Sequence, residues 1–291
     1  MLFFTQNGKC FWMRVFEIPE GSKTSKGRAI QNLINLEPDD KLKAFICTQD
    51  LKDEEYINSH YVIMATKKGQ VKKTSLEKYS RPRANGINAI TIREGDELLE
   101  AKLTNGNSQV MLAVKSGKAI RFEESKTRPM GRNASGVRGI TLKDGKDEVV
   151  GMVSVNDMST DILVVSECGY GKRSKLDDYR ITNRGGKGVK TISITPKTGA
   201  LVALKNVSDL DDLMIINKSG IAIRLPVSTL RVMGRATQGV KLINLKGDDS
   251  IAAVAKVMNE EEDVEEFAKE EDPDATPETK DGTNIVDDSE E

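Results

Sequence analysis

A repeat of about fifty residues constrains the fold of this chain more than any other feature of its sequence. Three consecutive apolar residues, followed by a glycine four positions after the last of them, occur five times. The glycines are separated by 61, 48, 52 and 51 residues: Gly8, Gly69, Gly117, Gly169 and Gly220. Such spacing indicates that the chain assembles one structural unit per repeat.

A second glycine follows each first glycine, at offsets of 19, 17, 19, 19 and 19 residues: Gly27, Gly86, Gly136, Gly188 and Gly239. In four repeats an isoleucine lies four residues beyond it: Ile90, Ile140, Ile192 and Ile243. Segments 128–140 (RPMGRNASGVRGI) and 231–243 (RVMGRATQGVKLI) agree most closely and lie two periods apart. Because several spaced positions coincide without a gap, the repeats are related units.

Each unit has the pattern of short β-strands joined by turns. Asn7-Gly8 is a hairpin signal, because both residues tolerate positive φ. A third apolar-rich segment closes each unit, at 41–48, 97–103, 148–155, 200–207 and 250–257. Inside the repeats no segment keeps a 3.6-residue apolar period over the length of a packed helix. We therefore expect an all-β, propeller-like ring of four-stranded blades, with five blade units visible.

The two ends of the chain differ from the repeats. Residues 260–291 hold 16 acidic and 2 basic residues, which leaves 42 basic and 29 acidic residues in the remainder. We expect the repeats to occupy residues 1–258 and an acidic, disordered tail to occupy 259–291. Leu2-Phe3-Phe4 resembles the middle of a buried strand. We therefore expect a truncated first blade, with further residues preceding Met1.

Positive charge recurs at matched positions of the repeats. Four residues after the first glycine lie Lys73, Arg121, Arg173 and Arg224, with Lys72 and Lys172 beside two of them. The loop between the two glycines carries Lys23, Lys26, Arg81, Arg83, Arg128, Arg132, Arg180, Arg184, Lys187, Arg231 and Arg235. Two residues after the second glycine lie Arg138, Lys190 and Lys241.

Equivalent positions in successive blades face the same way, so repeated bases predict a basic belt around the outside or one rim. Such a belt suits the phosphate backbone of double-stranded DNA and carries little sequence information. In the segment Arg184-Gly185-Gly186-Lys187-Gly188, the glycines allow close approach of phosphate and offer N–H donors. The alternative for each single residue is an ordinary solvated side chain.

Other chemistry is poorly supported. The three cysteines are scattered and form no Cys-x-x-Cys pair, so no disulfide framework or zinc site is indicated. His60 is the only histidine and lies in a polar connector. Gly169-Tyr170-Gly171-Lys172-Arg173-Ser174 lacks the glycine spacing of a phosphate loop. Neither a membrane span nor a signal peptide is indicated. We expect a cytoplasmic, non-catalytic chain without a cofactor or metal of its own.

The repeat pattern, the R-G-G-K-G loop, the M-G-R segments and the acidic tail together resemble the C-terminal domain of the DNA gyrase A subunit. The resemblance covers nearly the whole chain. It implies a β-pinwheel, in which strands are exchanged between blades, and positive wrapping of DNA around a basic rim. It further implies partners in the bacterial cytoplasm: the rest of gyrase A, together with gyrase B. ATP and Mg²⁺ would act elsewhere in that assembly, which introduces negative supercoils.

The family's defining box, Q-R-R-G-G-K-G, matches here only in its last five residues, at 184–188 in the fourth repeat. We interpret residues 182–188 as a degenerate copy of the box and expect the box itself before Met1. Two alternatives stay open. One is the C-terminal domain of the topoisomerase IV protein that corresponds to gyrase A, and the other is a protein-interaction propeller with no nucleic-acid role.

Overall fold

The computed structural model describes residues 1–22, 26–143, 145–247 and 249–258. It divides into a compact unit, Met1–Val257, and a second unit, Met258–Glu291. Lys23 and the acidic segment 259–291 lie outside the described residues. The strands and turns that follow make up the first unit.

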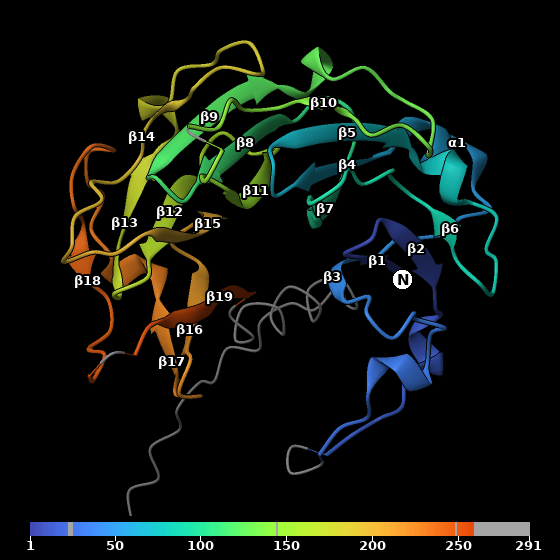
Figure 1. The fold of residues 1–291 in the computed structure, drawn as a ribbon, viewed down its shortest axis with the longest axis horizontal. Helices are drawn as coiled ribbons and strands as arrows, with labels where there is room; N and C mark the ends of the chain where they lie inside the picture. Colours follow the sequence, from blue (N-terminus) through green and yellow to red (C-terminus); the bar gives the residue numbers. More distant parts are fainter. Residues whose placement is uncertain (23–25, 144, 248, 259–291) are drawn as a thin grey trace, which may run out of the picture. The chain divides into compact units, whose positions relative to one another are not determined.

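Each repeat begins with a β-hairpin closed by its first glycine (Figure 1). The strands before that glycine are β1 (Leu2–Thr5), β4 (Tyr61–Thr66), β8 (Gln109–Val114), β12 (Asp161–Ser166) and β16 (Asp211–Asn217). The strands after it are β2 (Lys9–Trp12), β5 (Gln70–Ser75), β9 (Lys118–Glu123), β13 (Tyr170–Lys175) and β17 (Ala222–Pro226). All five pairs are antiparallel.

Two further kinds of strand complete the sheets. The segments predicted to close each repeat form β3 (Leu42–Ile46), β7 (Leu98–Thr104), β11 (Val149–Val155), β15 (Leu201–Val207) and β19 (Ile251–Met258). Two-residue strands follow the second glycine: β6 (Ile87–Asn88), β10 (Val137–Arg138), β14 (Val189–Lys190) and β18 (Val240–Lys241). The predicted all-β class is thus confirmed.

Short helical turns link the strands. Five of the six 3-10 turns in the described residues are η1 (Val15–Glu17), η2 (Ile30–Asn32), η3 (Leu76–Tyr79), η4 (Glu124–Lys126) and η5 (Leu176–Asp178). The sixth is η6 (Val227–Thr229), and one six-residue α-helix, α1 (Glu54–Ser59), precedes β4. From η3 onward, each 3-10 turn follows directly on the second strand of its hairpin.

The short strands exchange between repeats. The sheets have the orders β3-β1-β2-β6, β10-β5-β4-β7, β11-β8-β9-β14, β15-β12-β13-β18 and β17-β16-β19. In the first four, the outermost strand comes from the following repeat. The first sheet therefore has four strands and is not truncated, contrary to our expectation. Among the described residues, the fifth sheet has three strands.

The apolar side chains pack between neighbouring sheets. In β4, Val62 and Met64 belong to a cluster shared with the first repeat. Ile63 and Ala65 belong to one shared with the third repeat. Alternate residues of a strand point to opposite faces, so both faces of this sheet are buried. This explains why the strand before the first glycine is continuously apolar, and why each repeat depends on its neighbours.

The paired glycines mark these junctions between repeats. Gly169 has φ +79°, and a Cβ there would lie 2.8 Å from the carbonyl oxygen of Ile243, the isoleucine of the next repeat. Gly136 has φ +84°, and a Cβ there would lie 2.5 Å from the carbonyl oxygen of Val71 in the preceding repeat. The conformation and the close approach both favour glycine. The glycine and isoleucine spacing in the sequence therefore records how one repeat docks on the next.

Candidate nucleic-acid interface

Three of the four bases predicted four residues after the first glycine are buried within the fold. Lys73, Arg121 and Arg173 have relative exposures of 5%, 6% and 7%. The expectation that they form an exposed belt is wrong, because both faces of their sheets are covered by neighbouring repeats. Arg224 in the last repeat is the exception: its side chain is 45% exposed and its Nε lies 2.6 Å from Asp212 Oδ2.

The buried members of this set hold the 3-10 turn of the next repeat. Arg121 donates to the carbonyls of Leu176 at 2.7 Å and Tyr179 at 3.0 Å. Arg173 donates to the carbonyl of Val227 at 3.1 Å. In the first repeat, the Trp12 indole N–H donates to the carbonyl of Tyr79 at 2.8 Å. These donors satisfy carbonyls across three of the four junctions between repeats.

Lys73 acts at the same place through a carboxylate. Its Nζ lies 2.8 Å from Oε1 of Glu124, the first residue of η4 in the next repeat, and both side chains are buried. Glu124 also accepts hydrogen bonds from the Thr104 hydroxyl at 2.7 Å and the Ser108 amide at 3.1 Å. A buried ion pair with these extra bonds is a structural element of the junction.

Lys72 and Lys172 are also buried, at 0% and 1% exposure. Their ammonium groups contact carbonyl oxygens, and burial lowers the pKa of Lys72 to about 7 and of Lys172 to about 8. The expectation that these two lysines lie on an exposed basic belt is therefore wrong as well.

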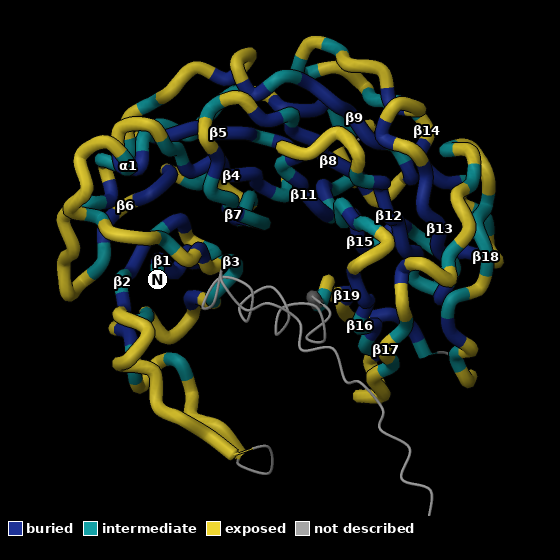
Figure 2. Tube along the Cα trace, turned by 180° about the vertical axis from the view of Figure 1, so that it is seen from behind, coloured by how far each residue is buried: buried dark blue, intermediate teal, exposed yellow. Residues whose placement is uncertain are grey.

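The remaining predicted bases lie in the loops and outermost strands. Figure 2 shows most strands buried and the connecting loops exposed. The exposed bases, called here the outer bases, are Lys26, Arg81, Arg83, Arg128, Arg138, Arg180, Lys187, Lys190, Arg231 and Lys241. Arg132, Arg184 and Arg235 are partly buried beside them. Ten of the predicted positions thus present charge to solvent, together with Arg224.

The exchanged strands give three outer bases equivalent positions. Arg138, Lys190 and Lys241 are the second residues of β10, β14 and β18, each the outermost strand of its sheet. Figure 1 shows these strands on the outer side of their sheets. Lys190 pairs across the ladder with Lys118, a base that the sequence analysis did not single out. Two adjacent lysines at a sheet edge favour an anionic partner.

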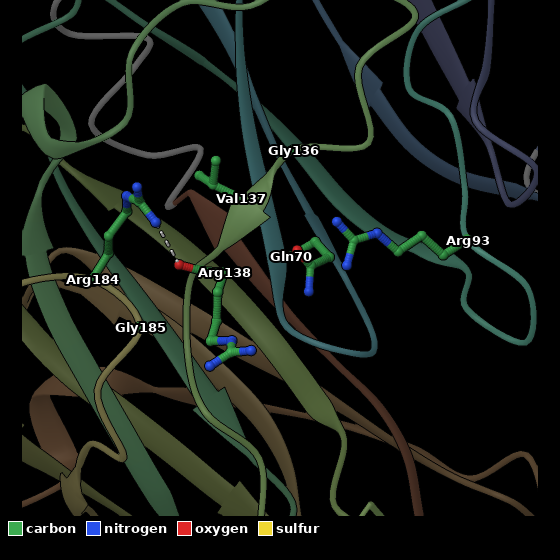
Figure 3. Close-up of a pocket in the computed structure, with 7 residues that line it drawn as sticks. All are labelled: Gln70, Arg93, Gly136, Val137, Arg138, Arg184 and Gly185. Atoms are coloured by element: carbon green, nitrogen blue, oxygen red, sulfur yellow. Dashed lines mark hydrogen bonds between the residues drawn. The ribbon is translucent and has the colours of Figure 1, made fainter.

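A cleft of about 530 Å³ brings together arginines from three successive repeats. Arg93, Arg138 and Arg184 line it with Gln70, Gly136, Val137 and Gly185, and these described lining residues include no carboxylate (Figure 3). Arg184 donates through Nη1 to the Arg138 carbonyl at 3.0 Å and through Nε to the Lys126 carbonyl at 2.9 Å. Three guanidinium groups around one cleft suit a phosphate oxygen.

Arg93 was missed by the sequence analysis. It lies seven residues after the second glycine Gly86, and Lys143 and Lys246 hold the same place after Gly136 and Gly239. That spacing was the available signal.

The glycine loop is engaged by its neighbour. The Gly185 amide donates to the Gly139 carbonyl at 2.6 Å, and the Thr141 hydroxyl donates to the Gly185 carbonyl at 2.6 Å. The prediction that this loop offers free N–H donors is therefore wrong for Gly185. Gly186, Lys187 and Gly188 line a second cleft of about 340 Å³ with Arg180. Charge there comes from the side chains.

The described residues lack the features of two other kinds of site. No group of three or more His, Cys, Asp or Glu side chains among them could hold a metal ion. No helix in the described part of the chain is long and apolar enough to cross a membrane.

Four of the five antiparallel sheets take their outermost strand from the following repeat, and three of these strands carry a base. This arrangement defines a strand-exchanged β-propeller with a basic outer edge. The family model for the DNA gyrase C-terminal domain, beta-propeller, matches residues 1–49, 60–105, 109–156, 160–208 and 211–258. The chain belongs to this family.

Relatives of known name agree with this assignment. The DNA gyrase A subunit of Staphylococcus aureus (strain NCTC 8325 / PS 47) is 43% identical over 284 residues, which are 97% of this chain and 31% of that protein. The gyrase A protein of strain MRSA252 is 43% identical over 267 residues, 91% of this chain and 30% of that protein. The chain thus spans about a third of the length of these relatives.

Solved structures share the fold. The C-terminal domain of DNA topoisomerase IV superposes with a TM-score of 0.81 at 23% identity, covering 93% of this chain and 83% of that one. A DNA gyrase A C-terminal domain gives a TM-score of 0.75 at 25% identity, covering 88% of this chain and 82% of that one.

Proposed function

We propose that this chain binds and wraps double-stranded DNA through its outer bases, as a non-catalytic part of a DNA gyrase. The observation that carries the proposal is the repetition of exposed bases at equivalent places of successive repeats, above all Arg138, Lys190 and Lys241. Bases repeated in this way match a partner whose charge also repeats, and the phosphate backbone of a duplex is such a partner.

The proposed contacts are to phosphate rather than to base edges. The described bases lie on short strands and loops, and the exposed segments described include no helix long enough to enter a major groove. Bending a duplex over about 25 base pairs costs several kcal/mol, so contacts from several blades act together. We expect little sequence preference and a steep dependence of affinity on salt.

In the proposed assembly, the protein partners are the remainder of gyrase A and the whole of gyrase B. Strand cleavage, ATP and Mg²⁺ belong to those parts, and this chain supplies the path of the DNA. Identity of 43% to gyrase A proteins favours gyrase over topoisomerase IV, whose similarity at 23% identity supports the fold alone. A protein-interaction propeller would instead bind an acidic protein.

The proposal is tested by the topology of bound DNA. Relaxed closed-circular DNA is incubated with increasing amounts of the domain, treated with a nicking–closing topoisomerase and deproteinised. We expect a shift in linking number that grows with protein and has the positive sign of the proposed wrap. If the distribution of linking numbers stays unchanged at concentrations where the domain retards duplex fragments, the domain binds DNA but does not wrap it. If the chain is instead a protein-interaction propeller, duplex DNA should not displace an acidic peptide bound to it.

A further inference from the structure

Two of the loops between paired glycines rest on a buried lysine. These are the MGR loops, residues 129–136 and 232–239, which contain the two closely matching sequence segments. The residue three places after the first glycine of the preceding repeat lies beneath each of them, and it is Lys72 or Lys172. Under the glycine loop of the fourth repeat, the equivalent residue is Ile120, which packs against Gly186. A buried lysine is thus found beneath both MGR loops and not beneath the glycine loop of the fourth repeat.

Lys72 lies at the junction of the second and third repeats. Its Nζ donates to the carbonyl oxygens of Ala89, at 2.5 Å, and of Arg132 in the MGR loop. The loop also runs beside the same strand, because the Met130 amide donates to the Lys73 carbonyl at 2.8 Å. The backbone that carries Arg132 is thus fixed directly by an ammonium group.

Lys172 makes the equivalent contacts two repeats later. Its Nζ donates to the Gly234 carbonyl at 2.6 Å and lies 3.1 Å from the Thr237 hydroxyl. The Met233 amide donates to the Arg173 carbonyl at 2.8 Å. Arg235 in this loop reaches the Lys190 carbonyl at 2.8 Å, so the loop connects the buried lysine with an outer base.

The charges around both lysines are mainly positive. Arg132 faces Lys72; Arg235 and Lys190 face Lys172, with Asp178 as the opposing carboxylate. Among the described residues neither lysine forms a salt bridge. Burial raises the pKa of Cys10 and Tyr79, which face Arg132, and of Tyr179, which faces Arg235, so these groups stay neutral near pH 8.

We propose that Lys72 and Lys172 are positioning residues that hold the MGR loops for DNA, and that both lysines take up protons when DNA binds. The inference rests on the proposed function. A buried ammonium group that forms no salt bridge is stabilised by an anion that approaches its loop. The phosphates of a bound duplex supply that anion, and the proton comes from the buffer.

The direction of the effect follows from the protonation states of the free protein. Burial and the neighbouring guanidinium groups lower both pKa values to about 7 and about 8, so at pH 8 a large fraction of each amine is neutral. If DNA raises the proton affinity of each lysine about tenfold, binding at pH 8 takes up roughly 0.8 proton and affinity falls about fivefold per pH unit.

The test is isothermal titration calorimetry with a DNA duplex of about 40 base pairs, at pH 8 and low salt. Parallel runs in phosphate and in Tris, whose ionisation enthalpies differ, give the number of protons taken up. We expect net uptake for the wild type and for H60Q, which removes the only histidine. We expect proton uptake to be abolished in K72M/K172M and to be kept in the surface variant K78M. An unaltered far-UV circular dichroism spectrum shows that K72M/K172M is folded.

Each outcome has one meaning. Equal heats in the two buffers for the wild type would overturn the inference even if the double variant failed to fold. Proton uptake that persists in a folded K72M/K172M protein would overturn it as well. The absence of any binding heat, at pH 6.5 as well as at pH 8, would instead contradict the proposed function.

Discussion

Arg121 in the third repeat donates a hydrogen bond of 2.7 Å to the carbonyl of Leu176 in the fourth. The bond crosses the junction between two blades, and a base at this position recurs through the chain. A base that recurs at this position therefore joins neighbouring blades, whereas bases that recur at exposed positions form a surface for a partner. Bases that look alike in the sequence consequently differ in their expected roles.

Replacing Arg121 by methionine should destabilise the fold. The change leaves the buried carbonyls of Leu176 and Tyr179 without their donor, and we expect a loss of about 2 kcal/mol in the free energy of unfolding. Urea denaturation measures it. R224M is the matched control, because this arginine holds the same position in the last repeat and is 45% exposed; about 0.5 kcal/mol is expected there. Equal losses in the two variants would contradict the role of the junction.

Substitution of the paired glycines should depend on whether a neighbouring repeat covers them. Gly136 and Gly220 both have positive φ, +84° and +88°, so alanine costs about 1 kcal/mol at either from backbone strain. A Cβ at position 136 would also lie 2.5 Å from the Val71 carbonyl, whereas nothing lies within 4 Å at position 220. We expect G136A to lower the thermal midpoint far more than G220A does. A similar drop in both would indicate that strain alone sets the cost.

Charge reversal at the exchanged strands should weaken DNA binding. We expect R138E/K190E/K241E to lower duplex affinity at least tenfold, and to reduce the slope of log K against log salt by about 0.9 for each phosphate that is no longer neutralised. Fluorescence anisotropy over a salt series gives both quantities. K52E, an exposed base outside the matched positions, is the control of equal chemistry. If K52E lowered duplex affinity as much per reversed charge as the triple variant does, the outer bases would have no special role in binding.

The stability of the domain should rise between pH 7 and pH 9. The folded pKa of Lys72 is about 7 and lies below the unfolded value of 10.5, so the unfolded chain binds more protons in this range. Stability therefore increases with pH there, by about 1 to 2 kcal/mol per buried lysine. Unfolding at fixed ionic strength measures it, and K72M should reduce the slope. A stability that is flat or falling for the wild type would contradict the lowered pKa.

Much of the fold was predictable because a buried strand requires a recognisable pattern of apolar residues. A strand covered on both faces is continuously apolar, and the glycine that closes its hairpin needs positive φ, so Ile63-Met64-Ala65 and Gly69 were readable without a structure. The exchanged strands were not readable from residue pattern. Val137-Arg138 is only two residues long, and nothing local tells which sheet it joins. Only the family resemblance implied that exchange.

The site was predictable in part. Loop bases such as Arg81 and Arg128 are exposed, as the polar context of their loops indicated. Lys73 and Arg121 were misplaced, because a base in a strand was assumed to face solvent. Trp12 at the matched position of the first repeat was the missed signal: an indole N–H there indicates a buried place that needs a donor. Whether the outer bases contact DNA stays a prediction.

The salt dependence of duplex binding tests the central claim most directly. The affinity of the wild-type chain for a duplex of random sequence is measured from about 50 to 300 mM salt at constant pH. We predict a straight line of log K against log salt with a slope of about −5 or steeper, which corresponds to roughly six neutralised phosphates. We also predict the same line for an unrelated sequence. No binding at the lowest salt, or an affinity that does not change with salt, would contradict the account.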